Sequence, residues 1–538
     1  MQFLDVETRH QLGFDDIWSR IQPVSSLGRS WMRKATAFTQ DQSDDLVQEL
    51  NRLESISVHL KRDPSMAENL SFLLSTVRDI GGSLNRSMQG ITLDDMEFYE
   101  VKKLLMIVGK IQVELERLGW TTFLPAPFDR CIECKEALGV GQGGHASFYL
   151  ADAYDEQLAR VRKERAHLER VLAEFRASVD SEMIQAVGRI LSMNGDIAVS
   201  TKDKEMISRL EAMVELEKVQ ETSDCVTFQL VEDERMDQVR QTLSQIREEE
   251  ERIKHQVRVK LTCLMADYGP RLRGVLEQVA FFDVLLAKAK FAAEIDGVKP
   301  QLCEDSIIRI NKGRHPLVEE EVTQGGHDYT PLCLEVSSGV TLITGPNMGG
   351  KTASLKTTGL LVVMAQYGLM VPASSMEFRP RQFVRAHLAA AEIPRGLSAF
   401  AGEVVFLRDV IEGSDGDGLI LVDEIAHGTN PVEGAGVAQA VLEYLNYKPT
   451  ITAVTTHYPS LAQLEDIAHL RVRGLDKGKL GQGQIDSLQR YMDYSLEVVG
   501  PGRPLRSDAV IVADALGLNS MIIKRAKELL EKRDRTDA

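Results

Sequence analysis

Apolar residues recur three and four positions apart through roughly the first 120 residues of the chain. The stretches DDLVQELNRLESISVHLKR and LDDMEFYEVKKLLMIVGKIQVELERL show this spacing most clearly. Residues at such intervals lie on one face of an α-helix, so the pattern is typical of amphipathic helices packed against a core. The sequence therefore predicts an all-helical region between about residues 12 and 120.

Two later segments are long, highly charged and patterned like coiled-coil helices. Their apolar seams are interrupted by Arg165 in the first segment and by Glu250 in the second. Between them, NGDIAV and DCVTFQLVED have strand character, so we expect two antiparallel arms that run out to a small tip and back. The seam residues are Leu158, Val161, Leu168, Leu172 and Phe175 in the first arm, and Val239, Leu243, Ile246, Ile253, Val257 and Leu261 in the second.

From about residue 300 onward, short apolar runs of β type alternate with helical patterns. The runs are TLIT at 341, LILVDE at 419 and TITAVTTH at 450. Strands that alternate with helices are typical of α/β folds, in which a mostly parallel sheet is buried between helices.

A glycine-rich turn follows the first of these runs. It matches G-x-x-x-x-G-K-[ST] at full length and lies between an apolar strand and a helix, which is the context that the phosphate-binding P-loop requires. Backbone N–H groups and the helix N-terminus would surround phosphate, the lysine would reach the β and γ phosphates, and the threonine could ligate Mg²⁺. The residues of the motif are Gly345, Pro346, Asn347, Met348, Gly349, Gly350, Lys351 and Thr352.

Two further elements complete a hydrolysis site. The run GLILVDEIAHGTNP ends its strand in Asp423 and Glu424, which places one carboxylate for Mg²⁺ and the next for orienting or deprotonating the attacking water. The run TAVTTHYPSL places His457 beyond another strand, where its imidazole could contact the γ-phosphate or that water.

These motifs resemble those of the MutS ATPases, which share a P-loop fold and a composite dimeric site with the ABC-type ATPases. The resemblance implies that Lys351 and Thr352 bind phosphate and Mg²⁺, that Asp423 holds Mg²⁺, that Glu424 activates water, and that His457 senses the γ-phosphate. It is carried by GRHPLVEE at 313–320, ITGPNMGGKT at 343–352, LVDEIAHGTNPVEGAG at 421–436 and TTHYPSL at 455–461.

The resemblance also implies a homodimer. Where the family carries a Ser-Thr-Phe segment that reaches the partner's nucleotide, this chain has Ser398, Ala399 and Phe400, so the Ser398 hydroxyl is expected to make that contact in trans. The C-terminal stretch ADALGLNSMIIKRAKELLEKR is expected to help hold the dimer together, although the lead-in typical of the family is replaced by GPGRPLRSDAV.

The expected fold is an α-helical core and lever with a coiled-coil clamp, followed by an α/β P-loop ATPase domain of ABC type. The stretch GFDDIWSRIQPVSSLGR is similar to the opening of the family's core and lever helices, and the chain leaves no room for the mismatch-reading and connector domains or for a C-terminal small MutS-related nuclease domain. The expected parts are a helical core and lever at 1–150, clamp arms with a small tip at 151–262, a helical return of the lever at 263–300, and the ATPase domain with a C-terminal dimerisation segment at 301–538.

The amino-acid composition indicates where in the cell the protein acts and whether it uses disulfides. Hydrophobic residues at 43% and charged residues at 27%, with apolar runs too short for a bilayer, predict a soluble cytoplasmic protein without a membrane role. Six cysteines give no disulfide framework, and the single CxxC pair, Cys131 and Cys134, is interpreted as incidental rather than as a metal or redox site.

Charge leaves the client of the ATPase open. The family default is an ATP-gated dimeric clamp on branched or recombining DNA, and the basic clusters RVRKER and RIKHQVRVK favour it. The net charge of −17 and an acidic tip around 192–236 favour a protein client instead. The resemblance allows such a client, because MutS-like proteins are also associated with adenosylcobalamin-dependent aminomutases as reactivating, chaperone-like ATPases. A purely structural dimer fits less well, because it would not need the hydrolytic carboxylate.

Overall fold

The computed structural model describes residues 2–142, 147–192, 195–231, 234–346, 349–388, 399–413, 415–475, 492–500, 509–515 and 517–534. The chain divides into two compact units. The first unit comprises Met1–Thr76, Ile111–Pro127 and Gln278–Ala538, and the second comprises Val77–Lys110 and Phe128–Glu277. Two long helices, α7 (Asp95–Leu118) and α11 (Glu234–Glu294), contribute residues to both units.

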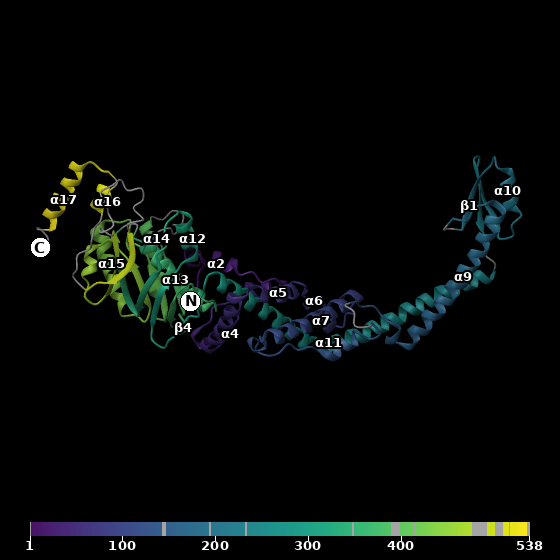
Figure 1. Ribbon diagram of the computed structural model, residues 1–538, viewed down its shortest axis with the longest axis horizontal. Helices are drawn as coiled ribbons and strands as arrows, with labels where there is room; N and C mark the ends of the chain where they lie inside the picture. The colour runs from purple at the N-terminus through teal and green to yellow at the C-terminus, as the bar shows by residue number, and fades with distance from the viewer. Residues whose placement is uncertain are drawn as a thin grey trace. The chain divides into compact units, whose positions relative to one another are not determined.

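In the second unit, α9 (Glu156–Val187) and α11 lie side by side and antiparallel (Figure 1). Arg162 pairs with Glu250, and Arg247 pairs with Glu169, so residue numbers rise along one helix as they fall along the other. This unit also contains the shorter helices α6 (Gly81–Met88) and α8 (Ile132–Ala137).

The two residues that interrupt the apolar seams contact each other. Arg165 donates to Glu250 at 2.8 Å, and Glu250 also pairs with Lys254 at 3.0 Å. The seam residues Leu158, Ile253 and Val257 are buried around this cluster. The predicted pair of antiparallel helices is therefore present, with a charged cluster inside its interface.

A small sheet lies between α9 and α11 in the chain and forms the tip. Its strand order is β1-β3-β2, with β1 (Asp196–Ser200), β2 (Leu216–Glu221) and β3 (Cys225–Leu230) all antiparallel. Helix α10 (Lys204–Glu211) and the end of α9 share an apolar core with it that includes Phe228 and Met183. The strands predicted for NGDIAV and DCVTFQLVED are confirmed as β1 and β3.

The first unit contains a six-stranded sheet with the order β13-β12-β7-β11-β10-β9. All neighbours are parallel except β12 and β13, so the predicted mostly parallel sheet is confirmed. The strands are β7 (Gly339–Thr344), β9 (Phe383–His387), β10 (Gly418–Val422), β11 (Ile451–Thr455), β12 (Ala468–Leu475) and β13 (Met492–Val498).

Helices cover both faces of this sheet. Residues of α13 (Lys351–Gln366) share a core with Ile343 and Leu421, whereas α14 (Ala399–Glu412) and α15 (Pro431–Asn446) share a core with Leu342 and Val422. Because neighbouring residues of one strand point to opposite faces, these two cores lie on opposite sides of the sheet (Figure 1).

A second sheet of four strands was not foreseen from the sequence. Its order is β4-β8-β5-β6, with one parallel and two antiparallel pairings. The strands are β4 (Gln301–Leu302), β5 (Ile307–Gly313), β6 (Leu332–Ser337) and β8 (Ser375–Phe378), and helix α12 (Pro316–Gln324) lies between β5 and β6 in the chain.

The helices predicted for the N-terminal region are confirmed, and several of them pack directly on the sheet domain. His315 of the GRHPLVEE motif is buried, and its Nε2 lies 3.2 Å from the carbonyl oxygen of Leu12; burial lowers the pKa of this imidazole to about 4. The side chain of Arg385 on β9 pairs with Asp5. The N-terminal helices of the first unit are α1 (Val6–Gln11), α2 (Phe14–Arg20), α3 (Ser26–Arg33), α4 (Ser43–Arg62) and α5 (Glu68–Ser75).

Near the C-terminus the structure describes helices α16 (Ala509–Ala515) and α17 (Ser520–Asp534). Cys131 and Cys134 are both buried, and the Cys134 sulfur lies 3.9 Å from the sulfur of Met265. Among the helices that the structure describes, none combines the length and the apolar character needed to cross a membrane.

Candidate functional site

The glycine loop joins the buried strand β7 to the N-terminus of α13. Gly350 caps this helix in the left-handed conformation with φ 81°, and a Cβ at this position would lie 2.9 Å from the ring of Tyr494. Both the conformation and the close approach require glycine. Asn347 and Met348 lie outside the described residues.

The side chain of Lys351, the first residue of α13, extends back into the preceding glycine loop. Its Nζ donates to the carbonyl oxygens of Gly345 at 2.9 Å and Pro346 at 3.3 Å, and only 5% of the residue is exposed. Burial lowers the pKa of Lys351, while the negative charges of Glu424 and Asp423 act in the opposite direction. The loop therefore holds an ammonium group where phosphate oxygens could receive its hydrogen bonds.

Asp423 lies at the end of β10 and joins three elements. Its Oδ2 accepts a hydrogen bond from the hydroxyl of Thr352 at 2.6 Å, and its Oδ1 accepts one from the hydroxyl of Thr455 at 2.6 Å. A hydroxyl and a carboxylate that meet beside a phosphate-binding loop are the hard oxygen donors that Mg²⁺ prefers. The residues present thus fit a Mg²⁺ ion held between Thr352 and Asp423.

Glu424 and His457 form the other half of the site. The Nε2 atom of His457 lies 2.9 Å from Oε1 of Glu424 and 3.5 Å from Nζ of Lys351. Both side chains are partly exposed, which leaves their polar atoms accessible to water. This arrangement can orient a water molecule and accept its proton at the Glu424 carboxylate.

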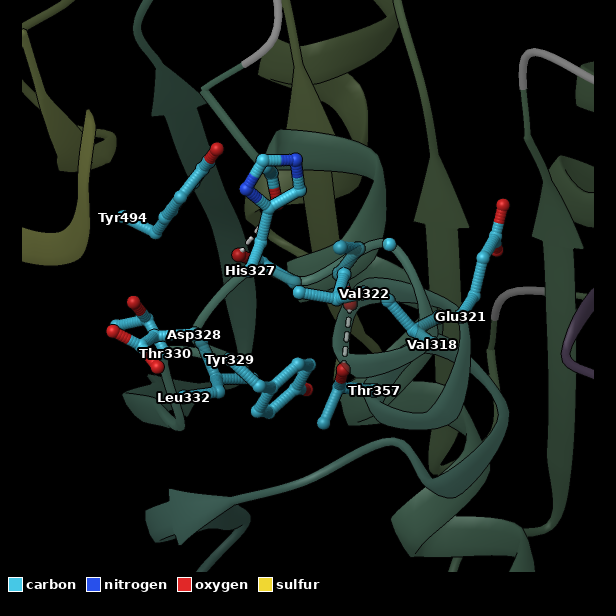
Figure 2. Close-up of a pocket in the computed structure, with 14 residues that line it drawn as sticks. Val318, Glu321, Val322, His327, Asp328, Tyr329, Thr330, Leu332, Thr357 and Tyr494 are labelled. Carbon is cyan, nitrogen blue, oxygen red and sulfur yellow. Dashed lines mark hydrogen bonds between the residues drawn. The ribbon is translucent and has the colours of Figure 1, made fainter. Parts of the chain in front are cut away.

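A cavity of about 440 Å³ adjoins the loop. Its lining includes Gly350, Ser354 and Thr357 from the loop and α13, together with His327 and Tyr494. Figure 2 shows the Tyr329 side chain extending from the segment before β6 toward Thr357. The cavity is large enough for a nucleoside and lies next to the phosphate-binding turn.

These cavity residues were not predicted from the sequence. The stretch GGHDYT precedes β6 and supplies His327 and Tyr329, while Tyr494 comes from β13. Paired glycines are a loop signal that could have drawn attention to this stretch, but nothing in the spacing connects it to a strand more than 150 residues later.

The structure brings together most of the residues that the sequence singled out. Lys351, His457 and Glu424 are joined by short polar contacts, Thr352 is hydrogen-bonded to Asp423, and the hydroxyl of Thr455 links the two sets. Gly345, Pro346, Gly349 and Gly350 form the turn beside it. Ser398, expected to act in trans, lies outside the described residues.

A parallel sheet with a glycine loop between β7 and α13, and a carboxylate pair after β10, defines a P-loop nucleotide-binding fold. Residues 341–533 match the family MutS domain V. This region of the chain is therefore similar to domain V of the MutS proteins.

Curated relatives extend the similarity beyond domain V. The chain is 27% identical to Endonuclease MutS2 of Geobacillus sp. (strain WCH70) over 84% of its own length and 57% of the relative's. A similar match, at 27% identity over 84% of this chain and 56% of the relative, is the protein of the same name from Caldicellulosiruptor saccharolyticus. The Thermomicrobium roseum protein of that name is 36% identical over 50% of this chain and 34% of its own length. The chain thus spans little more than half the length of these relatives at most.

Proposed function

We propose that this chain is a MutS-type ATPase that binds ATP with Mg²⁺ and hydrolyses it to ADP and phosphate. The observation that carries the proposal is the convergence of Lys351, the Thr352–Asp423 pair and the Glu424–His457 pair at the carboxyl edge of one sheet.

Each residue has a role that follows from its position. The loop N–H groups and Lys351 bind the phosphates, and the cavity beside Tyr494 receives the base and sugar. Thr352 and Asp423 would hold Mg²⁺, which supplies charge neutralisation to the phosphate oxygens. Glu424 accepts the proton of the attacking water at its carboxylate, and His457 holds that carboxylate in place through Nε2.

A Glu424→Gln variant tests this assignment. The amide retains the size of the side chain but cannot accept the proton, so we expect nucleotide binding to persist while hydrolysis falls by about 100-fold or more. The measurement is steady-state phosphate release together with equilibrium binding of a fluorescent ATP analogue. Hydrolysis by the variant at the wild-type rate would falsify the role of Glu424.

We further propose that the active form is a homodimer that acts on DNA as an ATP-gated clamp. Ser398 of each subunit would complete the partner's nucleotide site, and the α9–α11 pair would form the clamp arms. Support comes from the match to MutS domain V and from the MutS2 name that the relatives carry. A ligand-driven switch of this kind requires DNA to bind the ATP and ADP forms with different affinity.

A protein client is the second candidate, and a specific observation favours it. Six basic residues of the arms are held in ion pairs with acidic neighbours, which reduces their attraction for phosphate. The paired residues are Arg162 with Asp152 and Glu250, Arg165 with Glu250, Arg252 with Glu249, Lys254 with Glu250 and Glu251, Arg258 with Asp95, and Lys260 with Asp155. In the tip, strand β2 exposes Glu217 and Glu221.

ATPase assays and DNA titrations at low salt separate the two clients. Salt-sensitive binding of duplex or branched DNA, with stimulation of hydrolysis, supports the DNA clamp. Basal hydrolysis without DNA binding at low salt supports the protein client. A reciprocal check is the effect of ATP on DNA affinity, because coupling between two binding sites acts equally in both directions.

A further inference from the structure

The turn that follows β10 has an unusual backbone. Glu424 has φ 55° and Ala426 has φ 58°, although neither residue is glycine. Left-handed conformations cost a residue with a side chain of the order of 1 kcal/mol and persist only where the surroundings enforce them. The turn carries the proposed hydrolytic glutamate, so what enforces its shape also places that carboxylate.

Each of the five successive N–H groups of this turn has a partner. Asp423 donates to the carbonyl oxygen of His387 at 2.8 Å, and Ile425 donates to that of Thr455 at 3.1 Å. The N–H of Glu424 donates to the hydroxyl of Thr455 at 2.7 Å. The N–H of His427 donates within the turn, to the carbonyl oxygen of Glu424, at 3.1 Å.

The fifth N–H, that of Ala426, is bound from outside the strands. It donates to Oε1 of Glu403 on α14 at 2.6 Å. The carbonyl oxygen of the same residue accepts a hydrogen bond from the hydroxyl of Tyr458 at 2.8 Å. Both backbone polar groups of Ala426 are therefore hydrogen-bonded to side chains from distant parts of the chain. We call this pair of side chains, Glu403 and Tyr458, the Ala426 clamp.

The clamp is closely packed. Glu403 is only 4% exposed, and Ala426 is buried as well. A Cβ placed on Gly434 of α15 would lie 2.6 Å from the Tyr458 hydroxyl and 3.0 Å from the Ala426 carbonyl oxygen. The absence of a side chain at Gly434 lets α15 close over the clamp, so the turn has little room to relax into a more favourable backbone conformation.

Glu403 is also poorly placed for stability alone. Burial raises its pKa to about 7, and its hydrogen bond from Ala426 only partly offsets this. Burial raises the pKa of the Tyr458 phenol, and the charge of the Glu403 carboxyl raises it further. Burying a carboxyl group with one hydrogen bond costs free energy, so packing alone does not account for Glu403. A role in positioning the strained turn does.

We propose that Glu403 and Tyr458 are positioning residues that hold Ala426 in its left-handed conformation and thereby fix Glu424 against His457 for hydrolysis. The inference rests on the proposed ATPase function. Among the described residues, the hydrogen bonds of both side chains go to Ala426, so both act through the two-residue link from Ala426 to Glu424.

The test compares Glu403→Ala, Glu403→Gln and Tyr458→Phe in the full chain. We expect Glu403→Ala to lower kcat by about 10-fold or more, because small displacements of a catalytic group have large effects on rate. ATP affinity should stay within about 3-fold of wild type, since the phosphate-binding loop is not altered. Glu403→Gln retains an acceptor for the Ala426 N–H and should restore most of the rate, and Tyr458→Phe should lower kcat with less disturbance of packing.

Hydrogen exchange of the peptide that contains residues 423–430 supplies a readout that does not depend on turnover. It should become faster in Glu403→Ala and Tyr458→Phe, whereas Glu412→Ala, at an exposed position on the same helix, should leave both exchange and kcat unchanged. If Glu403→Ala does not fold, Tyr458→Phe decides the question by the same two measurements.

The outcomes separate the two proposals. If the wild type is active and kcat is unchanged in Glu403→Ala and Tyr458→Phe, the positioning role of the Ala426 clamp is contradicted, while the proposed ATPase function is not. Equal losses in Glu403→Ala and Glu403→Gln, without faster exchange, also contradict the positioning role. A wild type that binds ATP but releases no phosphate contradicts the ATPase function itself, and with it the catalytic role of the clamp.

Discussion

The hydroxyl of Thr455 binds both members of the carboxylate pair: it donates to Oδ1 of Asp423 at 2.6 Å and accepts from the N–H of Glu424 at 2.7 Å. Thr455 is the last residue of β11, the strand next to β10 in the sheet. One side chain thus orients the proposed Mg²⁺ ligand and the residue that bears the proposed base.

We expect Thr455→Val to raise the Mg²⁺ concentration needed for half-maximal hydrolysis by about 10-fold or more, because loss of a group that orients a metal ligand typically costs 10- to 100-fold in affinity. Valine has nearly the same shape, so the fold should persist. Thr455→Ser retains the hydroxyl and is the matched control. A Mg²⁺ titration of phosphate release measures the effect, and equal requirements in both variants would contradict this role of Thr455.

The cavity beside the loop leads to a second prediction. Removing the ring in Tyr494→Ala should weaken ATP binding by about 2- to 10-fold through lost aromatic contact. Affinity for inorganic triphosphate should not change, because the phosphate-binding residues remain. Competition binding against a fluorescent ATP analogue measures both ligands, with Tyr447→Ala at an exposed position of the chain as the control. Equal weakening of ATP and triphosphate would place the defect in the loop and not in the cavity.

The sequence could predict the phosphate-binding half of this site because its chemistry is local. The loop from Gly345 to Thr352 is contiguous, and Asp423 and Glu424 follow a recognisable apolar strand. The partners that position these residues come from distant elements: Thr455 from β11, Glu403 from α14 and Tyr494 from β13. Such contacts depend on the order of strands in the sheet, which hydrophobic periodicity does not reveal.

The same distinction applies to the arms. The heptad pattern predicted the two helices, and it showed Arg165 and Glu250 as separate interruptions. Only the register of α9 against α11 shows that the two residues meet at 2.8 Å. The second sheet escaped prediction for another reason, because β4 is only two residues long and β5 and β8 pair across more than 60 residues of chain.

The buried cluster in the arms gives a third prediction. Glu250 is only 2% exposed; burial opposes its ionisation, but Lys254, Arg162 and Arg165 keep its pKa below the ordinary value. Glu250→Ala leaves these cations without their shared carboxylate and should destabilise the arms by about 3 kcal/mol or more. Chemical denaturation followed by circular dichroism measures the loss, and Glu249→Ala, which removes an exposed ion pair on the same helix, should cost much less. Similar losses in both variants would contradict a special role for the cluster.

The raised pKa of Glu403 gives the protein a specific dependence of stability on pH. The carboxyl has an ordinary pKa of 4.5, and burial raises it to about 7 in the folded chain, so folding favours the protonated form. Its contribution to stability is therefore complete below about pH 4.5, declines as the pH rises toward 7, and is lost above that value.

Glu403→Gln cannot ionise and should lack this decline. The measurement is the difference in urea midpoint between wild type and variant at several pH values from 5 to 8. We expect the variant to gain relative stability as the pH rises, because the wild type must then either bury a charge beside Ala426 or retain its proton against the solvent. Parallel midpoints across this range would mean that Glu403 does not change its protonation on folding, and the pH dependence of the whole protein would have to come from other groups, such as the buried imidazole of His315.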